Sequence, residues 1–197
     1  MTCAFAHQSI SAAAQNQGVD AFRDGKSLLV DPPDGKLPLQ PWAALEKKSR
    51  TLTERGYDEP TAHCFPPGAP RGMWIPDGYQ IVQTRDYIVF LQERVAWRIV
   101  PLHSGADATR HLPDNMRLWQ GDSVGHWEED TLVIDTANLN GKDWLSEGGD
   151  VTSYAAHLVE RITPTGPDTF RYEATVNDPV VYTRVVMRRT ASRILAT

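Results

Sequence analysis

The sequence predicts a mainly β protein, an antiparallel β-barrel with one α-helix near its N-terminus. From Gly78 onward the chain consists of short runs rich in Val, Ile, Tyr, Phe and Thr, which are typical of strands. Glycine, proline, aspartate and asparagine separate these runs, and most connections are too short for a crossover helix, so neighbouring strands should pair antiparallel. A series of meandering strands with a single helix favours a closed or nearly closed barrel over a parallel sheet. The predicted strands cover residues 78–84, 86–93, 95–102, 130–136, 154–162, 169–176 and 181–189.

Three further segments precede this region. Residues 1–36 show no sustained periodicity, so we predict a flexible N-terminal arm there, followed by a single β-barrel domain over residues 37–197. Helical spacing of apolar residues predicts one amphipathic helix over about residues 41–55, because Pro41 suits a first helical turn and Gly56 suits a helix end. Residues 62–71 are rich in proline and should form an irregular segment that lies across another part of the fold.

The composition restricts the class of partner. The formal net charge is −5, and basic residues form no run longer than a pair, which argues against nucleic acid or an anionic membrane as a partner. No apolar stretch approaches the ~18 residues that a membrane span needs. We therefore expect a small-molecule substrate or ligand as the partner, and we leave a homodimer open.

The cysteines and the N-terminus bear on the cellular compartment. Cys3 and Cys64 are the only cysteines, too few for a disulfide framework or a thiolate zinc site, and the sequence leaves open whether they pair with each other. The small residues before Gln15 resemble the end of an export signal, but the segment lacks a basic start and an apolar core. We expect a cytoplasmic protein as the chain stands, or a periplasmic or otherwise exported one if its true start lies upstream.

Residues Gly121 to Gly125 read G-D-S-V-G and match the G-x-S-x-G pattern of a serine hydrolase. That chemistry needs a strand, a sharp turn and then a helix whose N-terminus helps to stabilise the oxyanion. Here residues 126–128 are followed by the acidic turn of residues 129–130 and by an alternating, β-branched run. The sequence therefore predicts a β-hairpin, and Ser123 is not expected to be a nucleophile.

The same hairpin carries a resemblance to a known family. Four motifs, taken together, resemble a largely uncharacterised bacterial family of small, usually exported β-proteins: G-x-S-V-G-x-W-E-x-D-T-L-V-I-D-T at 121–136, P-W-A-A at 41–44, C-F-P-P-G-A-P-R at 64–71 and H-L-V-E-R at 157–161. The match covers roughly residues 38–190. The resemblance implies a lipocalin-like or calycin-like β-barrel, but no reaction. Where this family tends to have His, Glu and Asp near the barrel mouth, the chain has Thr152, Tyr154 and His103.

Alternation along the predicted strands selects candidate polar residues. Glu160 shares its strand face with two apolar residues, so its carboxylate should point to the interior, where Arg98 is a candidate partner. Glu93 and Asp135 end similar runs and are candidates for the barrel rim. The alternatives for Arg98 and Glu160 are a purely structural ion pair or surface positions.

Aromatic residues are numerous enough to line a cavity, and a barrel of about eight strands can hold one small ligand. The residues expected to contact this ligand are Trp97, Trp119, Trp127, Tyr182, His157 and Glu93. The alternative for most of the aromatic residues is a place in the core.

The six histidines raise the question of a metal ion. No pair has the H-x-H, H-x-x-H or H-E-x-x-H spacing of common metal sites, so we expect no metal. His7, His63, His111 and His126 are interpreted as loop or surface residues. No nucleotide-binding motif is present either, so we expect no cofactor.

Two functions from different classes remain. The first is a cofactor-free acid–base enzyme of the lyase, isomerase or cyclase type, which acts on a small, partly apolar, oxygenated organic molecule in the barrel cavity. Its candidate catalytic residues are His103, Tyr154, Asp135, Glu160 and Arg98. The second is a lipocalin-like protein that binds a small ligand without turnover. His103 favours the enzyme, because it lies in a loop at the end of a strand and an imidazole exchanges protons near neutral pH.

Overall fold

The computed structural model describes residues 10–16, 28–50, 58–75, 78–93, 96–146 and 148–195, with residues 10–16 and 191–195 described by their backbone. Within these residues the protein is mainly β, with antiparallel strands and one α-helix, as the sequence predicts. No helix in this part of the chain combines the length and the apolar character that a membrane crossing requires.

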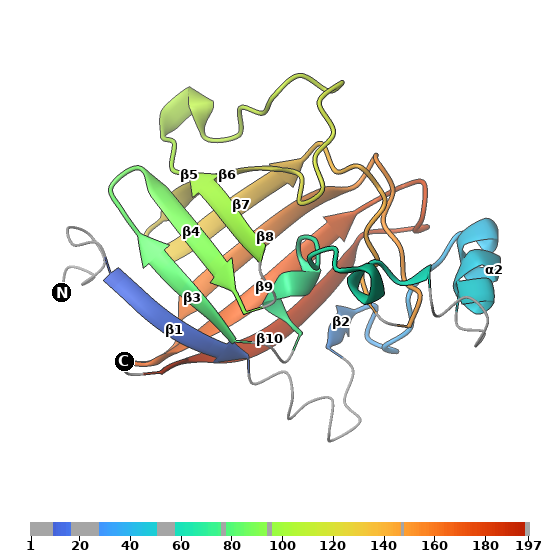
Figure 1. Cartoon of the computed structure of the whole chain (residues 1–197), viewed down its shortest axis with the longest axis horizontal. Coiled ribbons are helices and arrows are strands. Elements are labelled where there is room, and N and C mark those ends of the chain that lie inside the picture. Colours follow the sequence, from blue (N-terminus) through green and yellow to red (C-terminus); the bar gives the residue numbers. More distant parts are fainter. Residues whose placement is uncertain are drawn as a thin grey trace.

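The described strands form one ten-stranded sheet (Figure 1). Its strand order is β5-β4-β3-β1-β10-β9-β8-β7-β6, and β2 pairs with β10 outside this path. The strands are β1 (Ile10–Asn16), β2 (Leu29–Asp31), β3 (Gly78–Gln83), β4 (Tyr87–Gln92), β5 (Ala96–Pro101), β6 (Asp122–Glu128), β7 (Thr131–Ala137), β8 (His157–Pro164), β9 (Thr169–Asn177) and β10 (Val186–Leu195).

The sheet curves until its two edge strands, β5 and β6, approach each other (Figure 1). The described residues of these strands share no ladder, but Leu102 forms a single bridge with Gly125, and the backbone N–H of His103 donates to the carbonyl of Gly125 at 2.8 Å. A Cβ atom at Gly125 would lie 2.9 Å from the side chain of Val100. The glycine at this position therefore lets the two edges come together, which is a packing role for the second glycine of the G-x-S-x-G pattern.

Residues 10–16 correct the predicted N-terminal arm. They form β1, which pairs with β3 from Ile10↔Gln83 to Gln15↔Gly78 and with β10 on its other side. The run I-S-A-A-A-Q-N lacks the alternation and the aromatic content that would predict a strand. Its backbone groups instead bond to two neighbours, and that pairing stabilises the strand whatever the side chains. The prediction of an arm without regular structure is wrong for β1 and also for β2.

The predicted helix is confirmed over α2 (Pro41–Arg50), and its predicted last residues, 51–55, lie outside the described part of the chain. Basic residues occupy its last turn, where positive charge favours the helix dipole. The helix lies outside the sheet (Figure 1). Its Trp42 indole donates to the carbonyl of Val180 at 2.9 Å, and Ala43 is fully buried.

The proline-rich segment is irregular, as predicted. Residues 58–75 include two short 3-10 turns, η2 (Pro60–His63) and η3 (Arg71–Met73), and cross one end of the curved sheet (Figure 1). Met73 and Trp74 join the hydrophobic core. Cys64 in this segment is a free, exposed thiol, and Cys3 lies outside the described residues.

The predicted hairpin is confirmed. β6 and β7 pair from Asp122↔Ala137 to Glu128↔Thr131, and the two residues between them form the turn. The last predicted strand begins later than expected, because the side chain of Asp178 accepts the backbone N–H of Val180 and Val181 and holds them in a turn. As a result, β10 starts at Val186.

Candidate functional site

Arg98 and Glu160 meet inside the curved sheet, as predicted. The guanidinium of Arg98 on β5 donates to both carboxylate oxygens of Glu160 on β8, with Nη1 at 2.9 Å from Oε1. Glu160 is 0% exposed and Arg98 is 5% exposed. This bidentate geometry satisfies both charges away from water.

Three hydroxyl groups complete the buried network. The Nε of Arg98 donates to Ser123 Oγ at 2.9 Å, Nη2 donates to Thr136 Oγ1 at 2.7 Å, and the Tyr172 hydroxyl donates to Glu160 at 2.6 Å. Burial alone would lower the pKa of Arg98, but the carboxylate of Glu160 raises it above its ordinary value. Burial also raises the pKa of Tyr172, and the charge of Glu160 raises it further. Arg98 therefore stays charged and Tyr172 stays neutral around pH 7.

This network bears on two predicted roles. The burial of Arg98 and Glu160 and their bidentate contact favour a structural ion pair over a catalytic role. Ser123 is 5% exposed, and its hydroxyl is engaged by Arg98 and Thr136. The strand also continues through Ser123 into Glu128, without the helix that a nucleophile elbow needs.

A second polar cluster lies on the opposite, outer face of the sheet. In the β6–β7 ladder Ser123↔Thr136 is an inner pair, so the next pair, Val124↔Asp135, faces outward. Oδ1 of Asp135 lies 2.8 Å from Nε2 of His157 on β8 and 2.7 Å from Nε2 of His111. His111 belongs to the long connection between β5 and β6, which arches over this end of the sheet (Figure 1).

The pKa shifts of Asp135 and His157 favour the charged form of both groups. Burial opposes ionisation of Asp135, but the hydrogen bonds with His157 and His111 outweigh it and lower the pKa of the carboxyl. The hydrogen bond to Asp135 raises the pKa of His157. Asp122, at the start of β6, lies on the far side of His111, with Oδ2 at 3.1 Å from Nδ1.

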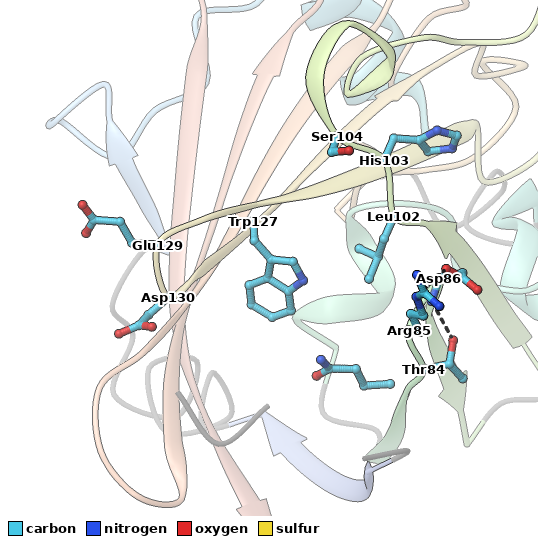
Figure 2. Close-up of a pocket in the computed structure, with 10 residues that line it drawn as sticks. Thr84, Arg85, Asp86, Leu102, His103, Ser104, Trp127, Glu129 and Asp130 are labelled. Atoms are coloured by element: carbon cyan, nitrogen blue, oxygen red, sulfur yellow. Dashed lines mark hydrogen bonds and ion pairs between the residues drawn. The ribbon is translucent and has the colours of Figure 1, made fainter. Parts of the chain in front are cut away.

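A pocket of about 450 Å³ lies at one end of the sheet, between the β3–β4 turn, the start of the long connection and the β6–β7 turn. Figure 2 shows the ring of Trp127 and the side chain of Leu102 between two polar sides. Its wall combines apolar surface, an imidazole and carboxylates, and the residues that supply these groups are Leu102, Trp127, His103, Asp86, Glu129 and Asp130. Pocket and outer cluster are distinct, because Trp127 is five residues along β6 from Asp122, or about 16 Å.

The structure therefore divides the predicted site residues between several places. His103 and Trp127 come together at the pocket, and Asp135 and His157 come together in the outer cluster. The predicted residues are not gathered in one place, and the described inner face carries core residues and the buried network around Glu160.

Three predicted ligand-binding aromatic residues lie elsewhere. Trp97 is 64% exposed on the outer face of β5, because its neighbour Arg98 occupies the inner face. Trp119 stacks on Phe65 at a ring distance of 4.7 Å, which fixes the proline-rich segment to the long connection. Tyr182 is 2% exposed, and its hydroxyl donates to the carbonyl of Val151 at 3.0 Å, so it is a core residue.

Two predicted polar residues also lie apart from both sites. Glu93 follows β4, where its carboxylate accepts the backbone N–H of Gly78 at 3.0 Å and so closes the β3–β4 ladder. Tyr154 is 60% exposed in the turn before β8, with the guanidinium of Arg117 over its ring. Neither residue lines the pocket described above.

Sequence reasoning missed His111 and Asp122. His111 was expected to be a loop or surface residue, yet its side chain is only 16% exposed because the connection folds back onto the sheet. The alternation of the hairpin places Asp122 and Asp135 on one face, and this signal was available. Nothing in the sequence indicates where along the connection a side chain returns to that face.

Comparisons of the chain with protein-family models, with curated proteins and with solved structures each found no match. The resemblance to a family of small bacterial β-proteins thus stays a prediction, and the function is inferred from the site geometry.

Proposed function

We propose that the protein is an acid–base enzyme of the lyase, isomerase or cyclase type, which acts on a small, partly apolar, oxygenated organic molecule in the pocket beside His103. The observation that carries this proposal is the mixed wall of the pocket: the imidazole of His103 and the carboxylate of Asp86 border the same space as Leu102 and Trp127. A pocket of about 450 Å³ suits a small ligand, and a few polar groups in an apolar wall are what such sites use.

In this proposal His103 accepts a proton from a carbon next to an oxygenated group and returns it elsewhere on the molecule. Trp127 and Leu102 hold the apolar part of the substrate. The hydrogen bond from the His103 backbone to Gly125 ties the base to β6, the strand that also carries Trp127. Base and wall are thus supported by one rigid element, which favours a constant distance between them.

We further propose that the curved sheet is a lipocalin-like barrel and that the pocket lies at its mouth. The strand order and the contact of the edges at Leu102–Gly125 support this proposal. If the edges stay together in solution, the amide of His103 should exchange with deuterium far more slowly than the amide of Ser104 in the same loop. Equal exchange rates would mean that the edges separate freely.

The experiment that tests the function combines binding with proton exchange. A panel of small hydroxylated and keto compounds is screened by thermal shift, and each stabilising compound is incubated with the protein in D₂O and analysed by mass spectrometry. Deuterium incorporation reports proton abstraction even where no new product accumulates. Trp127→Ala removes the apolar wall, and His126→Ala is the matched control, because this neighbour on β6 faces outward towards Glu128.

We expect some compounds to stabilise the parent and the His126→Ala variant but not the Trp127→Ala variant, and at least one of them to exchange or convert. Tight binding with neither exchange nor conversion would refute the enzyme and support the alternative, a protein that binds a small ligand without turnover. The apolar surfaces of Leu102 and Trp127 are the observation that favours this alternative.

A further inference from the structure

We propose that His111, Asp135 and His157 form a binding site for a divalent transition-metal ion, Zn²⁺ in the first place, on the outer face of the sheet. The three side chains come from the long connection, β7 and β8, and their ligand atoms all lie within 4.8 Å of one another. Both Nε2 atoms already contact Oδ1 of Asp135, at 2.7 Å and 2.8 Å. This site shares no residue with the pocket, so the proposal of a metal site does not depend on the proposed function.

Two imidazole nitrogens and one carboxylate oxygen are a donor set that zinc and ferrous ions use in proteins. Ligands of a tetrahedral zinc ion lie roughly 3.3 Å from one another, given metal–ligand bonds of about 2.0–2.1 Å. The nitrogen–oxygen separations here are about half an ångström shorter. Small side-chain rotations would therefore open the space that the ion needs, and the backbone can stay in place.

Asp122 contacts the nitrogen of His111 that faces away from this site. Its Oδ2 lies 3.1 Å from Nδ1 of His111 and is itself held by the backbone N–H of Leu112 at 2.7 Å. A neutral imidazole has one N–H, and if His111 donates it to Asp122, the lone pair of Nε2 points at the carboxylate of Asp135. Such a contact is repulsive without a cation. A carboxylate behind a metal-binding histidine is a common arrangement, because it fixes the tautomer that leaves the other nitrogen as a ligand.

Charge and access fit a divalent ion. Asp122 and Asp135 carry two negative charges, which one divalent ion balances when both histidines are neutral. The side chains of His111, Asp122 and Asp135 are 16%, 17% and 12% exposed, whereas that of His157 is 44% exposed. The connection thus covers one side of the site, and water can reach the other side to complete the coordination. The competing occupant is a proton on each imidazole, which would balance the same charge.

Metal-binding measurements distinguish a divalent ion from protonated imidazoles as the source of the balancing charge. The full chain, stripped with a chelator, is titrated with Zn²⁺ by calorimetry and with Co²⁺ by visible absorption, which reports the coordination number. We expect one ion per chain and the intense absorption of a low-coordinate Co²⁺ site. His111→Ala and His157→Ala should each weaken Zn²⁺ binding by about 100-fold or more, and Asp122→Asn by roughly 10- to 100-fold, since it removes only the supporting carboxylate. His126→Ala, a histidine on the same face outside the cluster, should match the parent.

Two results would overturn the proposal: no binding by the parent chain, or equal affinity in the parent and in His111→Ala and His157→Ala, which would indicate adventitious binding elsewhere. Circular dichroism of the metal-free variants checks that they fold, and His157→Gln replaces any alanine variant that does not. As a second readout, Zn²⁺ should raise the melting temperature of the parent and of His126→Ala but leave that of the His157 variant unchanged.

Discussion

Replacement of Glu160 by alanine should strongly destabilise the protein. The change leaves Arg98, which is 5% exposed, without the carboxylate that holds two of its nitrogens, and it leaves the hydroxyl of Tyr172 without its acceptor. Ser123 and Thr136 can still accept from the guanidinium, but they carry no charge. The buried positive charge would therefore remain uncompensated.

The magnitude follows from this burial. Removal of one partner of a buried ion pair costs about 3–5 kcal/mol. For a chain of this size, 1 kcal/mol corresponds to a shift in melting temperature of roughly 2–4 °C, so the variant should melt roughly 6–20 °C below the parent. The double variant Arg98→Met/Glu160→Leu should lose less, because no charge stays buried.

The matched control is the neighbouring residue on β8. Arg161 points to the opposite face and pairs with Glu128 at 2.6 Å, but the two side chains are 40% and 49% exposed. An exposed pair of this kind contributes little to stability because water screens its charges, so Arg161→Ala should melt within a few degrees of the parent. Thermal and urea unfolding followed by circular dichroism measure both variants. If Glu160→Ala has the same melting temperature as Arg161→Ala, the Arg98–Glu160 pair is not buried and the assignment of strand faces is wrong.

Three further predictions concern single residues. Ser123→Ala should lower the free energy of unfolding by about 1–3 kcal/mol in urea, because Arg98 loses an acceptor. A fluorophosphonate probe should leave Ser123 of the parent unlabelled. Labelling at Ser123 would support a serine hydrolase instead. Burial raises the pKa of Asp143 to about 7, so the folded state holds a proton that the unfolded state releases from about pH 4, and stability should fall as the pH rises from 4 to 7. Asp143→Asn should remove that part of the fall in a series of melting temperatures measured against pH. Identical pH profiles for the variant and the parent would refute this prediction. Gly121→Ala should destabilise the protein more than Gly105→Ala in the same urea assay. Both glycines have positive φ, but only at Gly121 would a Cβ meet atoms of β7 closer than 3 Å. Equal losses of unfolding free energy in the two variants would show that β7 shifts to accommodate the added atom.

The sequence predicted those features that depend on local pattern. The contact of Arg98 with Glu160 followed from alternation along two strands and from the chemical need to pair a buried carboxylate. The helix start at Pro41 and the hairpin after Gly125 followed from equally local signals. These predictions needed no knowledge of how distant segments meet.

The features that the sequence did not predict depend on distant partners. β1 is a strand because β3 and β10 offer hydrogen bonds on both its sides, although its own residues have little strand preference. Alternation shows which side chains share a face, but not how much space that face encloses, so the interior ligand site was expected where Tyr172 and the core now lie. The approach of His111 to Asp135 depends on the path of a long connection, which no periodic pattern describes.

The proposed function requires His103 to transfer protons to and from a molecule held in the pocket. The most direct test compares the parent with His103→Gln on the compound that the D₂O screen identifies, by the rate of exchange or turnover and by the Kd. A catalytic base should lose about 100-fold or more in rate while the Kd stays within a few-fold, because glutamine keeps polarity and size but cannot exchange the proton. If both the rate and the Kd of His103→Gln equal those of the parent, His103 is an ordinary loop residue and the proposed enzymatic function is wrong.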